Sequence, residues 1–227
     1  MQVINHWLNF ETPAQVAEAV CSDIMQHAEQ AIAERASFKL VLAGGTTPEQ
    51  VYKLLSKQQT DWSKWFVYYG DERCLPCEHA ERNSLMAQQA WLNHVPIPAR
   101  NLFSMPAELG PVIAAQRYTE SIADALPFDM VLLGMGEDGH TASLFPGHSH
   151  PDSDSVVAVF NSPKPPPERI SLSAGALSNS RRVVFIVTGA SKQTAVTQWQ
   201  AGVALPISSI APADGVSVYI DKAALGQ

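Results

Sequence analysis

The sequence predicts a three-layer α/β/α sandwich with a mostly parallel, twisted sheet, a Rossmann-like architecture. At least five short apolar runs alternate along the chain with segments of helical periodicity. Several of these runs lack polar alternation, which is typical of strands buried on both faces of a parallel sheet. The chain has 227 residues, 46% hydrophobic and 16% charged, and this composition predicts one globular domain over residues 1–227.

The predicted strands are short apolar or β-branched runs, and the first, residues 2–8, is expected at a sheet edge. The run at residues 129–133 carries the clearest signal, because it is uninterrupted and ends at a glycine. The other runs end at glycine-rich or charged turns or at proline-bearing loops. They are residues 38–42, 65–69, 101–105, 156–160, 169–173, 182–187 and 214–220.

The helices are predicted from caps and from apolar residues at helical spacing. Thr12 and Pro13 supply an N-cap and a first-turn proline, and apolar residues then recur every four positions to Ser37. Pro48 begins a second helix. The remaining helical segments are residues 83–92 and 111–126, a small helix after Ser173, a helix that starts near Lys192, and a short turn at 141–144 closed by Pro146.

Charge and composition exclude several classes of partner. The formal net charge is −7 and no run of Lys or Arg occurs, so we expect neither nucleic-acid binding nor an anionic-membrane surface. No apolar window is long enough to cross a bilayer, and the first ten residues lack signal-peptide features. An odd cysteine count, Cys21, Cys74 and Cys77, predicts reduced thiols. A cytoplasmic protein is expected, as a monomer or small homo-oligomer.

Ionisable residues gather where the strand at 129–133 ends. Glu137, Asp138 and His140 lie among three glycines, at the carboxyl end of a strand, where open α/β sheets place their chemistry. Histidine titrates near the pH at which enzymes work. Glycine spacing of this kind also occurs in plain turns, so the pattern alone leaves a catalytic site and a tight connection equally open.

Two further loops have the features of anion-binding sites. Gly44 and Gly45 precede a helix start, where backbone N–H groups and the helix dipole favour phosphate, and Thr46 adds a hydroxyl. Lys192 begins a helix at an end that favours anions, a conflict that a bound anion would resolve. The simpler alternatives are an ordinary connection and a solvated lysine.

Charged residues also follow the strand at 65–69, as Asp71, Glu72 and Arg73. Charges beside a buried strand are costly unless they pair or face a cleft, although a solvated turn is the alternative.

Two sequence patterns contain residue types that bind metal ions. Cys74 and Cys77 form a CxxC near His79, but a second ligand pair is missing. The polar loop at 148–154 holds two histidines and two aspartates, a composition that surface loops collect freely. We therefore predict no metal and no redox role.

The string GMGEDGHTASLFPG at residues 134–147 closely resembles the signature of the 6-phosphogluconolactonase family, which shares a sugar-phosphate superfamily with the glucosamine-6-phosphate deaminases. Four more motifs resemble the family in order, so the resemblance covers nearly the whole chain. They are GGTTP at 44–48, DER at 71–73, RISL at 169–172 and TGASK at 188–192.

The resemblance implies hydrolysis of 6-phospho-D-glucono-1,5-lactone without a cofactor. His140 would then be the general base and Asp138 would orient its ring. No serine lies in a nucleophile elbow, so no acyl-enzyme is expected. The family uses the phosphate loop, the Arg of RISL and the Lys of TGxxK on the phosphate. The resemblance thus implies a set of substrate-binding residues, with Arg73 at the acid end of the sugar. They are Gly44, Gly45, Thr46, Asp71, Arg73, Arg169 and Lys192.

The sequence leaves three alternatives open. A sugar-phosphate sensor would keep the phosphate loop without needing His140, and a structural protein would need none of the charged strand ends. A deaminase needs a second carboxylate near the histidine, and deaminases resemble one another in a glutamate-bearing FNEP-like string after DGH. The corresponding residues 143–146 contain no acid.

Overall fold

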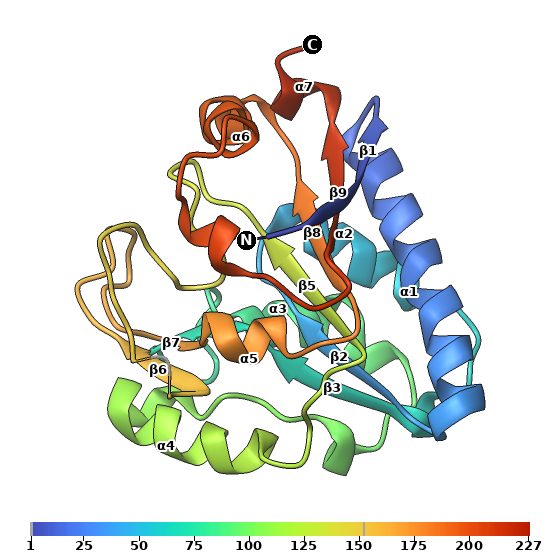
Figure 1. The fold of residues 1–227 in the computed structure, drawn as a ribbon. Helices are drawn as coiled ribbons and strands as arrows, with labels where there is room; N and C mark the ends of the chain where they lie inside the picture. Colours follow the sequence, from blue (N-terminus) through green and yellow to red (C-terminus); the bar gives the residue numbers. More distant parts are fainter. Residues whose placement is uncertain (1, 152) are drawn as a thin grey trace.

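The computed structural model describes residues 2–151 and 153–227, and its centre is a six-stranded parallel sheet (Figure 1). The strand order is β1-β9-β8-β5-β2-β3, and every neighbouring pair is parallel. The prediction of a mostly parallel sheet with an edge strand near the N-terminus is confirmed. The bounds are β1 (Ile4–Phe10), β2 (Phe38–Leu42), β3 (Trp65–Tyr69), β5 (Met130–Gly134), β8 (Val183–Val187) and β9 (Val216–Asp221).

Helices flank this sheet, with α1 along one side and α4 and α5 on the other (Figure 1). The first helix begins as predicted, because the Thr12 side chain accepts a hydrogen bond from the Gln15 N–H at 3.3 Å. It ends at Ala36, whose left-handed backbone (φ 59°) closes the last turn. The α-helices are α1 (Pro13–Arg35), α2 (Thr46–Leu55), α3 (Asn83–Ala90), α4 (Pro111–Ile122), α5 (Ala174–Ser178), α6 (Gln193–Gln200) and α7 (Lys222–Leu225). The 3₁₀ turns are η1 (Trp62–Lys64), η2 (Leu92–His94), η3 (Ala99–Asn101), η4 (Ala107–Leu109), η5 (Ala190–Lys192) and η6 (Pro206–Ser209).

A second, three-stranded antiparallel sheet was not predicted. Its order is β4 (Asp71–Arg73), β7 (Arg169–Leu172) and β6 (Val156–Val159). Gly70 connects the two sheets: its N–H donates to Leu42 O at 2.9 Å, and its carbonyl accepts from Leu172 N at 2.8 Å. The DER residues are therefore a short strand that leads away from the main sheet.

Two smaller predictions were wrong. Residues 141–144 form a tight turn that is not helical, because Ala142 has a left-handed backbone (φ 47°) although the Leu144 N–H donates to Thr141 O at 2.9 Å. The Thr141 hydroxyl donates to Gly134 O at 2.8 Å and holds this loop against the end of β5. Residues 101–105 form no strand, since only Leu102 is bridged, to Val67. Local side-chain hydrogen bonds and single bridges of this kind have no periodic sequence signal.

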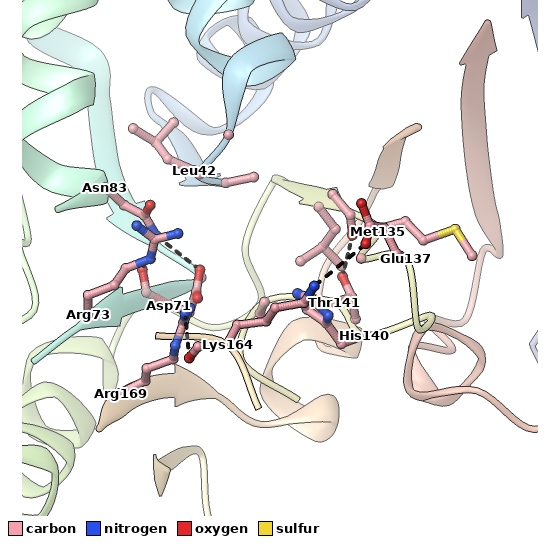
Figure 2. Close-up of a pocket in the computed structure, with 18 of the residues that line it drawn as sticks. Leu42, Asp71, Arg73, Asn83, Met135, Glu137, His140, Thr141, Lys164 and Arg169 are labelled. Atoms are coloured by element: carbon pink, nitrogen blue, oxygen red, sulfur yellow. Dashed lines mark hydrogen bonds and ion pairs between the residues drawn. The ribbon is translucent and has the colours of Figure 1, made fainter. Parts of the chain in front are cut away.

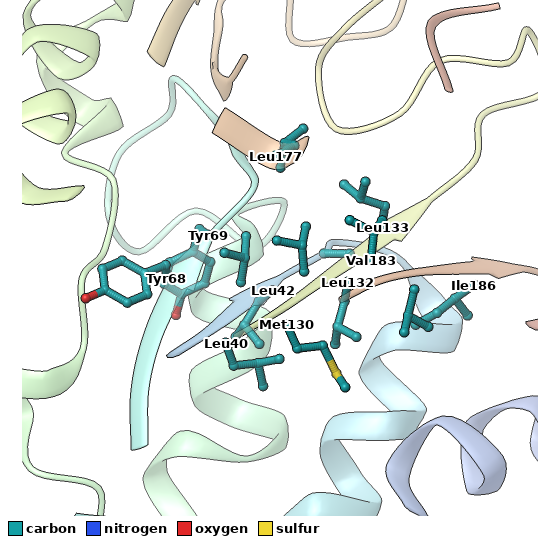
Figure 3. Close-up of a cluster of buried hydrophobic side chains, with 14 of the residues drawn as sticks. Leu40, Leu42, Tyr68, Tyr69, Met130, Leu132, Leu133, Leu177, Val183 and Ile186 are labelled. Atoms are coloured by element: carbon teal, nitrogen blue, oxygen red, sulfur yellow. The ribbon is translucent and has the colours of Figure 1, made fainter. Parts of the chain in front are cut away.

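The core lies between the central strands and the helices. Side chains of β2, β5 and β8, among them Leu40, Leu132 and Val183, are buried and pack together (Figure 3). Close packing makes the strand ends rigid supports for the loops beyond them. Within the described residues, none of the helices combines the length and the apolar character needed to span a bilayer.

Candidate active site

A cavity of about 430 Å³ opens at the carboxyl ends of the central strands (Figure 2). Because parallel strands all end at the same edge, the loops after β2, β3 and β5 converge there. Loops from the second half of the chain complete the walls. The lining includes Gly44, Gly45, Asp71, Arg73, Asn83, Glu137, His140, Lys164, Arg169 and Lys192.

His140 and Asp138 form a closely bonded pair in the loop after β5. Asp138 Oδ1 lies 2.5 Å from His140 Nδ1 and also accepts the His140 backbone N–H at 3.2 Å. Gly136 makes room for the pair, since a Cβ there would lie 2.0 Å from His140 Nδ1. The turn is closed by the Gly136 N–H, which donates to His140 O at 2.8 Å. A tight glycine turn thus fixes the imidazole beside the carboxylate.

The environment of the pair favours an ionised Asp138. Partial burial opposes the charge, but the hydrogen bond with His140 and the attraction of that ring lower the Asp138 pKa below its usual value. The carboxylate binds the Nδ1 side, which leaves Nε2 as the nitrogen that can exchange a proton with a ligand. Phe145 packs on the imidazole with ring centroids 4.6 Å apart and limits its rotation.

Asp71 lies on the opposite wall and is held by two neighbours. Its Oδ2 accepts from the Ser143 hydroxyl at 2.6 Å, and its Oδ1 accepts from Asn83 Nδ2 at 3.2 Å. The neighbouring Glu72 is fully buried and points elsewhere: its carboxylate accepts the Asn83 and Ser84 N–H groups, both at 2.8 Å, at the start of α3. Glu72 is therefore an N-terminal cap for α3, and Asp71 is the carboxylate that faces the cavity.

The phosphate-type loop lies at the start of α2. Gly45 has φ +110°, a conformation that favours glycine, and precedes the first residue of α2. A Cβ on Gly44 would lie 2.1 Å from Asn83 Oδ1, so only glycine fits between β2 and α3. Thr46 is exposed and does not line the cavity. The buried Thr47 instead bonds Thr188 at 2.6 Å and joins this loop to the one that carries Lys192.

Three cationic side chains predicted from the sequence line the cavity, but their bonding differs. Arg169 is buried and donates to the carbonyls of residues 164, 165 and 166 at 2.8–3.3 Å, and burial lowers its pKa. Arg73 donates through Nη1 to Glu81 O, and its buried Nε has no partner within the described residues. Lys192 ends η5 in a loop that Asp221 holds by accepting the Gly189 N–H at 3.0 Å.

Comparison with known proteins places the chain in a family. The sequence model described as glucosamine-6-phosphate isomerases/6-phosphogluconolactonase matches residues 11–219. The chain belongs to this family. It is 40% identical to the 6-phosphogluconolactonase of Synechocystis over 178 residues, covering 74% of this chain and 73% of the relative. A rice protein named probable 6-phosphogluconolactonase 3, chloroplastic, is 33% identical over 243 residues, covering 96% of this chain and 74% of the relative.

A solved structure agrees with this membership. The structure of 6-phosphogluconolactonase from Trypanosoma brucei superimposes with a TM-score of 0.88 at 26% identity, covering 100% of this chain and 99% of that one. The whole chain thus follows the fold of the family.

The cavity brings together most of the residues named from the family motifs. Asp138 lies behind His140, and Thr46 stands apart as the first residue of α2. The sequence pointed to both regions, because residues 82–84 resemble a family element and the proline-rich residues 161–167 are typical of a rim loop near the cleft, but neither Asn83 nor Lys164 was predicted as a site residue. The structure places the Asn83 side chain against Asp71 and brings Lys164 to the cavity wall. The other lining residues named in advance are Gly44, Gly45, Asp71, Arg73, Arg169 and Lys192.

The residues of the two candidate metal patterns do not form an ion-binding cluster in the part of the chain that the structure describes. Over residues 2–151 and 153–227, no three His, Cys, Asp or Glu side chains are grouped to hold an ion. Cys21, Cys74 and Cys77 are free thiols. Asp152 of the polar loop at 148–154 lies outside the described residues.

Proposed function

We propose that this chain is a 6-phosphogluconolactonase, which hydrolyses 6-phospho-D-glucono-1,5-lactone to 6-phospho-D-gluconate in the oxidative pentose phosphate pathway. One observation carries the proposal: a histidine bonded to a carboxylate at 2.5 Å shares a cavity with a glycine loop at a helix start and with Lys192. Family membership and the names of the similar proteins support the same reaction.

In the proposed reaction His140 is the general base. Its Nε2 accepts a proton from water while the water oxygen bonds to lactone C1. The Asp138 carboxylate orients the ring through Nδ1 and stabilises the imidazolium that forms. When the bond from C1 to the ring oxygen breaks, the imidazolium donates the proton to that oxygen. His140 is thereby returned to its starting state.

The substrate is held at its other end by the phosphate loop. The Gly44 and Gly45 amides, the positive end of α2 and Lys192 form an anion site that suits the 6-phosphate. We assign Arg169 to the same end, and Thr46 as the first residue of α2, through the backbone N–H that it adds to the positive end of that helix. We assign Asp71 and Arg73 to the sugar, with Arg73 toward its acid end.

Hydrolysis of freshly generated lactone, measured against its spontaneous opening, tests this function. We expect enzyme-dependent acid release well above the spontaneous rate. A rate equal to spontaneous opening would contradict the proposal and would favour a non-catalytic sugar-phosphate sensor if 6-phosphogluconate still bound.

The sister activity, deamination of glucosamine 6-phosphate, is the closest competitor. Its additional carboxylate is absent from residues 143–146, as the sequence indicated. Glu137 does line the cavity, but it precedes His140, whereas the deaminases carry their glutamate in the stretch after DGH. We therefore expect no ammonia from glucosamine 6-phosphate under matched conditions. Ammonia release at a rate comparable to lactone opening would reverse the assignment.

We also propose that the activity needs no cofactor and no resident metal, because the proposed reaction uses only protein groups and water. One connected core of buried residues supports a single domain over residues 1–227. The net charge of −7 and the small-molecule substrate argue against nucleic-acid and membrane partners. We place the protein in the cytoplasm, as a monomer or small homo-oligomer.

A further inference from the structure

Lys164 extends across the cavity toward the catalytic loop. Its Nζ lies 3.6 Å from Glu137 Oε2, and both side chains are about half exposed. Glu137 belongs to the same tight turn as His140, which the Gly136 N–H closes on His140 O at 2.8 Å. Figure 2 shows the Lys164 side chain running from the Arg169 side of the cavity toward His140 and Glu137. The ammonium therefore lies at the His140 end of the cavity.

The backbone that carries Lys164 is fixed. The Lys164 carbonyl accepts from the Ser162 hydroxyl at 2.8 Å and from Arg169 Nη2 at 3.3 Å. Its N–H donates to Ser162 Oγ at 3.2 Å. The Ser162 N–H in turn donates a hydrogen bond to Pro167 O at 3.0 Å and closes the loop. The ammonium can thus exchange partners by rotation of the side chain alone, without movement of the loop.

The other cations that line the cavity have different partners or positions. Arg169 donates hydrogen bonds to the carbonyls of residues 164–166, and Arg73 donates to Glu81 O. Lys192 lies in the loop that Thr188 and Thr47 join to the phosphate-type loop. Lys164 is the lining cation whose ion-pair partner comes from the histidine's own turn.

Lactone hydrolysis creates negative charge at the end of the substrate next to the base. The carbonyl oxygen carries that charge in the tetrahedral intermediate, and the product then carries it as a carboxylate. We infer that Lys164 is a further catalytic residue, whose Nζ leaves Glu137 to bind the reacting carbonyl oxygen and then the product carboxylate. Glu137 takes the ammonium back as product leaves. This inference rests on the proposed lactonase function.

Turnover gives the first test. Lys164→Met keeps the apolar stem and removes the charge, and we expect kcat for the phosphorylated lactone to fall by about 10²-fold. The matched control is Lys222→Met, because Lys222 is equally exposed and pairs with Glu11 at 2.7 Å outside the cavity. That control should keep the wild-type kcat. An unchanged kcat in Lys164→Met would overturn the inference.

Binding of two ligands then locates the contact. Calorimetry with 6-phosphogluconate and with glucitol 6-phosphate, which has the phosphate but no carboxylate, separates the two ends of the substrate. We expect Lys164→Met to weaken only 6-phosphogluconate, about tenfold or more, and Glu137→Gln to tighten it. Equal weakening of both ligands would make Lys164 a phosphate contact and would overturn the assignment, as would no weakening of either.

The two proposals fail in different ways. Wild-type protein that does not accelerate lactone opening contradicts the proposed function itself. An active wild type combined with an unaltered Lys164→Met contradicts only the role of Lys164. Circular dichroism of each variant checks that the fold is retained, which the exposure of Lys164 favours.

Discussion

Two Asp–His pairs lie at opposite ends of the strands of the main sheet, and they have similar chemistry but different surroundings. At the carboxyl ends of the strands, Asp138 binds His140 Nδ1 at 2.5 Å in a glycine turn beside the cavity. Near the amino end of β8, Asp23 on α1 lies 3.2 Å from His27 Nδ1, and both its oxygens accept from Arg182 at 2.9 and 3.1 Å.

The difference shows what makes such a pair reactive. Asp23 is neutralised by an arginine, and His27 is one turn away on the same helix, so the cluster ties α1 to the start of β8. In the ion pairs described, Asp138 has His140 as its partner, and the imidazole faces a cavity with room for a ligand. We conclude that two features distinguish the proposed base from a structural histidine. The proposed base faces a cavity, and its aspartate has no arginine partner among the ion pairs described.

Replacing each histidine should give the largest contrast. We expect His140→Ala to lower kcat by about 10²- to 10⁴-fold, the usual contribution of a positioned acid–base group, with little change in 6-phosphogluconate binding. His27→Ala should leave kcat unchanged. Steady-state kinetics on the lactone measures both. An unaltered kcat in His140→Ala would remove that residue from the mechanism.

The cations of the phosphate end should act on binding. We expect Lys192→Ala to raise KM about tenfold to a hundredfold, because it removes a charged contact remote from the reacting carbonyl. Arg169→Ala should raise KM too, and because Arg169 holds the 164–166 carbonyls, it should also lower kcat. Unphosphorylated gluconolactone provides the control. It should be a poor substrate that Lys192→Ala does not worsen; equal kcat/KM for the two lactones in the wild type would refute the phosphate assignment.

The pair of Asp23 and His27 should contribute to the free energy of unfolding and not to turnover. The hydrogen bond with Asp23 raises the pKa of His27 above 6.5, so the folded protein binds that proton more tightly than the unfolded chain. This stabilisation is complete below about pH 6.5 and is lost as the pH rises through the folded-state value. We expect His27→Gln to remove on the order of 0.5 kcal/mol at pH 6 and much less at pH 9. Urea unfolding at both pH values measures it, and a loss that does not depend on pH would contradict the assignment.

The smallest effects are expected at the cysteine pair. Cys77 is exposed, with Arg82 Nη1 3.8 Å from its sulfur, and Cys74 and Cys77 are free thiols. Cys77→Ser should change kcat by less than about twofold, and activity should survive EDTA. Turnover that EDTA abolishes and zinc restores would show a metal requirement that the proposed reaction does not have.

The sequence was sufficient for the parts that local patterns encode. Buried strands such as 38–42 and 65–69 have the same bounds in the structure, since apolar runs followed by turn residues are local signals. Motif resemblance named residues that converge at one cavity. Those that follow β2, β5 and β8 meet there because parallel strands end at the same edge, whereas Asp71, Arg73 and Arg169 are brought there by the antiparallel sheet.

The parts that escaped prediction depend on contacts between distant segments. The strands at 156–159 and 169–172 were predicted, but their pairing with residues 71–73 in a separate antiparallel sheet was not, because β4 is too short to show a periodicity. The cap that Glu72 of β4 forms on α3 and the reach of Lys164 toward Glu137 are likewise side-chain contacts between segments distant in the sequence. Spacing along the chain carries no information about them.

A double-mutant cycle on the lactone tests the central claim, that Asp138 and His140 act as one unit. Asp138→Asn keeps the size of the side chain and removes its charge, and alone it should lower kcat by roughly 10²-fold. If the carboxylate acts only through the imidazole, the double variant Asp138→Asn/His140→Ala will be no slower than His140→Ala alone. Two effects that multiply in the double variant would contradict the account, because Asp138 would then act independently of His140.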